Sequence, residues 1–259
     1  MTMTTLPYRV TPARVLRSEW HKFWTLRSTW ITLAVTSALT AAMGAGLGAA
    51  YDGTGEGGMD TVMFVLLGTQ FATINLGVLG ILATAGEYST GQIRATMTAV
   101  PRRLPVLWSK AAVLTAVALP LTLATNLLTF PLAQSFLTGT DLSASLGDPG
   151  VLRALAGNAA GLTLLAVLAL GIGALLRSVP TAIGAFIGLV MILPEILAML
   201  PYAFVDDAVR YFPGKALEAL TTAQPLPGTA SPGAALLAML LWTAVILTAA
   251  AVVLRRKDV

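Results

Sequence analysis

The sequence contains no cysteine, a single histidine and few charged residues. The lack of cysteine excludes disulfides, thiolate metal sites and cysteine nucleophiles, and the lone His21 excludes a multi-histidine metal site. Charged residues make up 11% of the 259-residue chain, whereas a soluble domain carries roughly 25%. Such a chain has too few charged side chains to cover a surface in water, so a soluble globular protein is excluded.

Catalytic motifs are also missing. The sequence has no GxxxxGK[ST] segment, so it cannot bind ATP through a P-loop. It has no HExxH motif, no GxSxG motif and no pair of carboxylates within an apolar segment. The residue pattern contains no nucleophile–base pair and no metal-binding constellation. We therefore expect no enzymatic activity of the chain itself, with no catalytic residue, cofactor or metal.

Long apolar runs dominate what remains. Hydrophobic residues make up 56% of the chain and its mean hydropathy is +0.79. A helix needs roughly 20 apolar residues to cross a bilayer, and its backbone polar groups must be satisfied within the segment. The sequence predicts an all-α integral membrane protein with six transmembrane helices, at about residues 30–50, 62–85, 106–130, 152–176, 181–200 and 234–254. Pro120 and Pro131 predict a kink or an early end of the third span.

The distribution of Lys and Arg predicts the orientation. With the N-terminus in the cytoplasm, thirteen of the sixteen basic residues fall in cytoplasmic segments, the exceptions being Arg153, Arg210 and Lys215. The positive-inside rule favours this topology. We expect a multi-pass protein of the bacterial plasma membrane, with cytoplasmic residues 1–29, a membrane domain at 30–254 and a cytoplasmic tail at 255–259. The net charge of +4 then reflects orientation and does not indicate nucleic-acid binding.

The residues before the first span form an amphipathic pattern. On a helix, one face would carry the apolar residues Leu16, Trp20, Phe23 and Trp24. Another face would carry Arg14, Arg17 and His21. This pattern predicts a helix that lies in the membrane interface. The helix is either an elbow that also contacts a partner protein or a passive anchor in the lipid.

Polar residues within the predicted spans are few. Glu195 is the only ionisable one, and it follows Pro194 near the outer end of its span. A carboxylate there has either a structural role or a contact with a substrate or gate. Uncharged polar residues either line a cavity or link helices by hydrogen bonds. The candidate substrate-path residues are Gln70, Asn75, Asn126 and Glu195.

Three GxxxG pairs and one proline-rich loop complete the pattern. The pairs permit close approach of helix backbones, within one bundle or at a dimer seam: Gly44/Gly48, Gly157/Gly161 and Gly184/Gly188. The loop at 201–233 predicts one or two short helices at the outer surface, as a connector or a gate.

The segment GEYSTGQIRATMTAVPRRLPVLWSK, residues 86–110, joins the second and third spans. Ser89 and Thr90 are candidate caps of a short helix that Pro101 ends. Its apolar stripe consists of Ile93, Met97 and Val100. We expect Lys110 to extend toward the lipid headgroups. The stripe suits either a groove of another protein or the lipid interface, and the residues alone favour neither.

This segment, together with the basic start LRSEWHKFWTLRSTW and the six spans, resembles the membrane subunit of type-2 ATP-binding-cassette (ABC) exporters, particularly small actinobacterial permeases. In that family the segment begins with an acid, followed by a Gly, a helical stretch, a Pro with basic residues and a Lys. The matching residues are Glu87, Gly91, QIRATMTAV, Pro101, Arg102, Arg103 and Lys110. Gln92 departs from the family, in which Thr is frequent at this position.

The resemblance implies a coupling helix that sits in a cleft of a separate ABC ATPase subunit, which would bind ATP and Mg²⁺. It also implies pairing with a second permease subunit, as a homodimer or heterodimer. The residues expected at the ATPase contact are Glu87, Gly91, Ile93, Arg94, Met97, Pro101 and Arg102. The expected function is export of a drug, an antibiotic or a lipid-like substrate. An ion-coupled secondary transporter that uses Glu195 and a non-transporting membrane scaffold are the alternatives.

Overall fold

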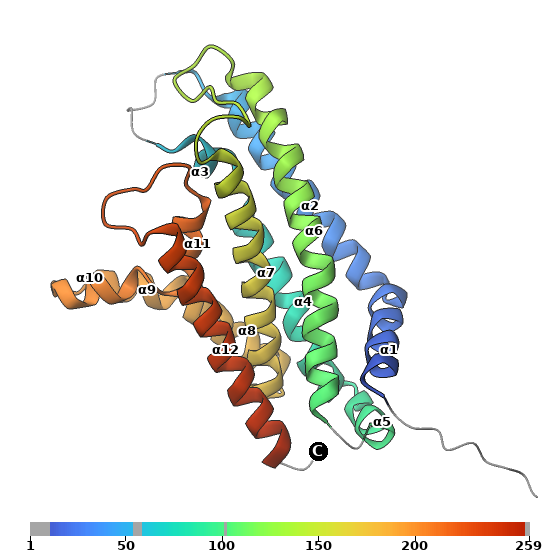
Figure 1. Cartoon of the computed structure of the whole chain (residues 1–259). Coiled ribbons are helices and arrows are strands. Elements are labelled where there is room, and N and C mark those ends of the chain that lie inside the picture. Colours follow the sequence, from blue (N-terminus) through green and yellow to red (C-terminus); the bar gives the residue numbers. More distant parts are fainter. Residues whose placement is uncertain (1–10, 54–58, 101–102, 257–259) are drawn as a thin grey trace, which may run out of the picture.

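The computed structural model describes residues 11–53, 59–100 and 103–256. Within these residues it contains helices and no strand, and six helical stretches are long and apolar enough to cross a membrane. They are α2 (Arg27–Ala50), α4 (Thr69–Ser89), α6 (Leu104–Leu137), α7 (Val151–Leu176), the continuous stretch Val179–Ala198 and α12 (Pro232–Arg256). The chain is therefore an all-α membrane protein, which confirms the predicted fold class. Figure 1 shows the long helices lying side by side along one common direction.

Helix α7 forms the centre of the bundle. It packs against α4, α6 and α12, and most of its length is buried, whereas α2 and α12 expose most of theirs. The larger apolar core gathers around α7 and includes Leu76, Leu114 and Phe186. Apolar side chains left exposed on the outer helices suit contact with lipid, because a bilayer does not penalise apolar surface.

The two ends of the bundle differ in charge. One end, called the basic end, holds α1 (Pro12–Thr25), α5 (Gln92–Ala99) and Arg255 and Arg256 at the end of α12. The other, called the acidic end, holds α3 (Thr61–Val65) and the loop that carries Asp141 and Asp148. Figure 1 shows α1, α5 and the end of α12 together at its lower end and α3 near its upper end.

The second and third spans differ from their predicted bounds. Residues 61–65 form the separate helix α3, because the carboxylate of Asp60 caps its start by accepting hydrogen bonds from the backbone N–H groups of Val62 and Met63 at 3.0 and 3.1 Å. The spanning helix α4 begins only at Thr69. In the third span, Pro120 and Pro131 both lie inside α6, which continues to Leu137. Neither proline ends the helix, since each removes one backbone hydrogen bond while packing against α2 and α7 holds the rest.

The fifth span is broken near its end. It consists of α8 (Val179–Ile187), the π-helix η1 (Gly188–Ile192) and α9 (Leu193–Ala198). Pro194 has no N–H, and its ring disfavours an ordinary helical turn against the carbonyl group of Val190, four residues earlier. The wide turn of η1 relieves that conflict. Figure 1 shows the consequence: α9 and α10 (Ala203–Val209) point sideways out of the bundle.

The loop between the last two spans contains the two short helices that the sequence predicted, α10 and α11 (Pro213–Thr221). Helix α11 lies against α7 and against η1. Gly214, near the start of α11, permits the second contact, because a Cβ atom there would overlap the carbonyl oxygen of Val190. The π-helical turn and this glycine together bring α11 onto the fifth span.

Candidate functional site

The first candidate site is the short helix α5 between the second and third spans. Gly91 begins it in the left-handed conformation, with φ of +71°, which glycine adopts without strain. The predicted caps are wrong, because the hydroxyl groups of Ser89 and Thr90 donate to the carbonyl oxygen of Gly86 in the preceding helix. The glycine therefore makes the turn that separates α5 from α4.

The orientation of α5 differs from the predicted docking stripe. Ile93 is only 7% exposed and packs against the rest of the chain, and Val100 lies beyond the last residue of the helix. Gln92 and Ala95 lie on the exposed side. A stripe at helical spacing identifies an apolar face but not what covers it, and here the chain itself covers Ile93. The side chains of Arg94 and Met97, and residues 101 and 102 (Pro101 and Arg102), lie outside the described part of the chain.

The helices on either side of α5 take part in a cluster of four charged residues, called the ion cluster: Glu19, Lys22, Glu87 and Lys110. The ammonium group of Lys110 lies 2.7 Å from Oε2 of Glu19 and 2.6 Å from Oε1 of Glu87. Lys22 also pairs with Oε1 of Glu87. The cluster therefore joins α1, the end of α4 and the start of α6.

The ion cluster is largely buried, which makes its charges depend on one another. Lys110 is 8% exposed and Glu87 is 4% exposed, so Lys110 does not extend to the headgroups as predicted. Two carboxylates face two ammonium groups, which leaves the cluster neutral. Glu19, Glu87 and Lys110 are buried, and the free-energy cost of their lost hydration is offset only while their partners stay in place. The cluster thus holds three helices in one arrangement.

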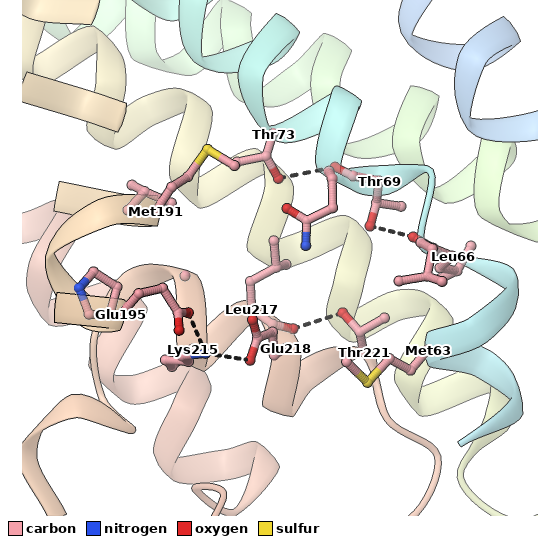
Figure 2. A pocket seen from close by; sticks show the side chains of 15 residues that line it. Met63, Leu66, Thr69, Thr73, Met191, Glu195, Lys215, Leu217, Glu218 and Thr221 are labelled. Carbon is pink, nitrogen blue, oxygen red and sulfur yellow. Dashed lines mark hydrogen bonds and ion pairs between the residues drawn. The ribbon is translucent and has the colours of Figure 1, made fainter. Parts of the chain in front are cut away.

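The second candidate site is a cavity of about 250 Å³ in the acidic half of the bundle, called the α4–α11 cavity. Gln70 from α4, Glu195 from α9 and Lys215 and Glu218 from α11 line it. Figure 2 shows Lys215 lying between the two carboxylates, with Thr69 and Thr73 of α4 on the far side. The structure thereby brings two of the predicted substrate-path residues, Gln70 and Glu195, to one cavity.

The α4–α11 cavity contains two carboxylates, Glu195 and Glu218, and one ammonium group, Lys215. The ammonium group of Lys215 lies 2.6 Å from Oε1 of Glu195 and 3.4 Å from Oε2 of Glu218. Glu195 keeps 59% of its side chain exposed. Burial is the main cause that raises the pKa of Glu218 above its ordinary value, while Lys215 opposes the rise. One ammonium group therefore pairs with two carboxylates, of which Glu195 is the more exposed.

The other two predicted path residues lie elsewhere. Asn126 is buried and donates to the carbonyl oxygen of Leu155 and to Oδ1 of Asn158, each at 3.0 Å. Asn158 in turn donates to the hydroxyl group of Thr221 at 2.9 Å. Asn126 therefore links helices, which is the structural alternative that the sequence left open. Asn75 does not line the α4–α11 cavity, and its Nδ2 is buried with no hydrogen-bond partner among the described residues.

Sequence reasoning missed the partners of these residues. Glu19 lies one helical turn from both Val15 and Phe23, on the buried side of α1, and that spacing was a usable signal. No comparable signal pointed to Lys215 as the partner of Glu195, because their contact depends on the wide turn of η1.

A metal site finds no support in the described residues, which hold no group of three or more His, Asp or Glu side chains placed to bind one. Comparison with protein-family models finds no match for this chain, and comparison with curated proteins also finds none. Any assignment of function therefore has to rest on the residues and on their geometry.

Proposed function

We propose that this chain is the permease subunit of an ATP-driven exporter and that α5 is its coupling helix. The basic end faces the cytoplasm, since it carries the Lys and Arg residues that the positive-inside rule places there. The chain has no P-loop of its own, so a separate ATPase subunit supplies ATP hydrolysis.

One observation carries this proposal: α5 is a short helix with an exposed side, and the two helices that flank it, α4 and α6, are joined by the ion pair between Glu87 and Lys110. A partner that moves α5 therefore moves the end of α4 and the start of α6 with it. Because Lys110 also binds Glu19, the same movement reaches α1. A flexible loop would absorb such a movement, whereas a short helix between two joined spans transmits it.

In this mechanism the ATPase binds one arrangement of the permease better than the other and so shifts the population between them. The substrate path opens along the helices that respond, and one of these helices, α4, lines the α4–α11 cavity. The exposed faces around Gly184 and Gly188 have open space within 4 Å among the described residues, which suits a second permease subunit there.

The test introduces a large side chain on the exposed side of α5. Ala95→Trp places a large side chain where the ATPase is expected to dock, and Ala208→Trp makes the same change at an exposed position on α10. The chain is purified with its associated ATPase in mild detergent and reconstituted, and ATP hydrolysis and transport are measured. We expect Ala95→Trp to reduce both and Ala208→Trp to leave them unchanged.

The opposite outcomes are equally clear. Transport that proceeds without any ATPase and stops in Glu195→Gln would instead support the ion-coupled alternative. Normal ATPase association and transport in Ala95→Trp would remove α5 from the coupling contact. Absence of any transport or ATPase partner would leave the membrane scaffold as the better description.

A further inference from the structure

The charges that line the α4–α11 cavity do not balance. Two carboxylates, Glu195 and Glu218, face one ammonium group, Lys215, so the lining carries one net negative charge. The guanidinium group of Arg210 lies outside this lining and pairs with Asp207. Burial keeps the pKa of Glu218 above its ordinary value although Lys215 opposes the rise. One ammonium group therefore does not fully compensate the two carboxylates, and a second cation would stabilise their ionised forms.

The charged groups of this cavity are accessible to a ligand. The side chains of Glu195, Glu218 and Lys215 keep 59, 39 and 27% of their surface exposed, respectively. The ion pair with Lys215 engages Oε1 of Glu195, whereas a carboxylate offers about four acceptor sites in all. Glu195 thus has acceptor capacity left for a donor that enters the cavity.

Gln70 supplies a further acceptor on the α4 side of the cavity. The hydroxyl groups of Thr69, Thr73 and Thr221, which also line the cavity, donate to backbone carbonyl oxygens. Gln70 is exposed, and its side-chain amide forms no hydrogen bond with another residue in the described part of the chain. Its amide oxygen is therefore free to accept from a ligand, while the carboxylates approach from α9 and α11.

The rest of the lining is mostly apolar. It includes Met63, Leu66, Val190, Met191 and Leu217. Figure 2 shows Met63 and Met191 on opposite sides of the cavity, and methionine side chains adapt to ligands of different shape. The volume of about 250 Å³ is small for a ligand pocket, so it suits a compact apolar body.

The net charge selects the kind of ligand. The carboxylates of Glu195 and Glu218 disfavour an anion, and they equally disfavour the phosphate of a zwitterionic lipid headgroup. A neutral molecule would leave the excess negative charge in place. A metal ion would lack a third His, Asp or Glu ligand among the described residues. A protonated amine compensates the charge and brings three N–H donors for the available acceptors.

We infer that the α4–α11 cavity binds a protonated primary amine with a compact apolar body, whose ammonium group donates to the carboxylate of Glu195, with Gln70 as a further acceptor. The binding follows from the cavity and its charges alone. Only the role of the amine as the exported substrate rests on the proposed function.

The experiment uses the purified full-length chain in phosphatidylcholine nanodiscs at pH 7 and a photoreactive derivative of hexylamine. We expect cross-links to the lining residues of α4, η1 and α11. Unlabelled hexylamine should compete at concentrations at least about tenfold lower than hexanol or hexanoate, the change expected for one charge-assisted hydrogen bond. Methylamine should compete more weakly than hexylamine, because it lacks the apolar body.

Three variants make the test specific. Glu195→Gln removes the accessible charge and should weaken labelling about tenfold. Asp207→Asn is the matched control, because it removes one negative charge outside the cavity, and it should label normally. Gln70→Glu adds a negative charge to the lining and should strengthen labelling. Glu195 and Gln70 are both exposed, so neither substitution disturbs the packed core.

Equal labelling of Glu195→Gln and Asp207→Asn would overturn the inference, as would weaker labelling of Gln70→Glu than of the wild type. Competition by hexanol as strong as that by hexylamine would show that no cation is selected. Competition by methylamine as strong as that by hexylamine would exclude the apolar body. Weaker labelling in nanodiscs that also contain phosphatidylethanolamine would show that a lipid headgroup occupies the cavity instead.

A separate arm distinguishes this inference from the proposed function. Labelling needs no ATPase, so Ala95→Trp, which is directed at the coupling contact, should label normally. In the reconstituted complex with the ATPase, hexylamine should stimulate ATP hydrolysis. Labelling without stimulation would show that the bound amine is not the substrate. Normal labelling by a chain that has no ATPase partner would overturn the proposed function and leave the amine site in place.

Discussion

The ammonium group of Lys110 lies 2.6 Å from Oε1 of Glu87, although the two residues belong to different spanning helices. The chain between them forms α5. The ion pair therefore closes the base of a loop whose tip is a short helix with an exposed side. This ion pair joins the two spans that flank α5, and it explains why Glu87 faces the inside of the bundle.

Lys110→Met tests how much the ion pairs of Lys110 contribute to stability. The substitution leaves Glu19 without its cluster partner and Glu87 with only Lys22. Breaking a buried pair by removing one partner costs about 3–5 kcal/mol, so we expect a fall of that order in the free energy of unfolding, measured by denaturant titration in detergent. Lys22→Met is the control, because Lys22 is more exposed and its loss should cost about 1 kcal/mol or less. Equal effects of the two variants would show that Lys110 contributes no more to the stability of the cluster than Lys22 does.

Asn158→Leu tests the polar link between α6, α7 and α11. Asn158 is fully buried, accepts from Asn126 and donates to Thr221. Interhelical hydrogen bonds in membranes contribute about 0.6 kcal/mol on average and up to about 1.7 kcal/mol, so we expect a loss within this range and faster amide exchange in α11. Gln70→Leu, at an exposed position in the α4–α11 cavity, should leave stability unchanged. Unaltered exchange in α11 would contradict the assigned role of Asn158.

Gly48→Ala tests the close approach of α2 and α6. A Cβ atom at Gly48 would lie 2.9 Å from the carbonyl oxygen and 3.4 Å from the Cα atom of Ala133, and backbone cannot move aside cheaply. Overpacking costs about 1–3 kcal/mol, so thermal unfolding should shift to lower temperature. Gly46→Ala on the same helix is the matched control, since a Cβ atom there meets nothing within 4 Å. A similar unfolding temperature for both variants would exclude a tight contact at Gly48.

Glu218 predicts a pH dependence at the acidic end. Burial raises the pKa of Glu218 above its ordinary value of 4.5, which means that folding favours the protonated carboxyl group. In the pH window between 4.5 and the raised pKa, the folded chain binds more protons than the unfolded chain, so stability falls as pH rises. We expect slower amide exchange in α11 as the pH falls from 7 toward 5, after correction for intrinsic rates.

Glu218→Gln should remove this part of the pH dependence. The neighbouring Lys215 titrates far above the window: burial lowers its pKa, but the pairing with Glu195 and Glu218 outweighs burial and raises the pKa above its ordinary 10.5. Glu195→Gln is the comparison, since it removes the other carboxylate and leaves Glu218 in place. A pH profile of α11 that is identical in the wild type and in Glu218→Gln would rule out the carboxyl group as its source.

The α5 segment shows how far a local pattern reaches. The sequence located a short helix between the second and third spans, because an apolar residue every three or four positions and a following proline are local features. It did not reveal that Ile93 packs inward or that Gly91 makes the turn. Which side of a helix is covered depends on neighbours from distant parts of the chain.

The candidate substrate path shows the same division. Gln70 and Glu195 were identified as unusual residues in apolar segments, and both line the α4–α11 cavity. Asn126 met the same criterion but serves as a link between helices. Gln70 and Asn126 both carry a side-chain amide within an apolar segment, so residue type does not distinguish them. Asn126 became a structural residue because α6 packs against α7.

The sequence by itself determined the class of this protein and the approximate positions of its spanning helices. Apolar length, the poverty in charge and the need to satisfy every backbone polar group within a bilayer leave no other fold class. The tertiary structure alone decided which charges meet: Lys110 with Glu19 and Glu87 at one end, and Lys215 with Glu195 at the other. The physical reason is that spanning helices form from local hydrogen bonds and hydropathy, whereas buried charges are placed by contacts among helices that are far apart in the chain.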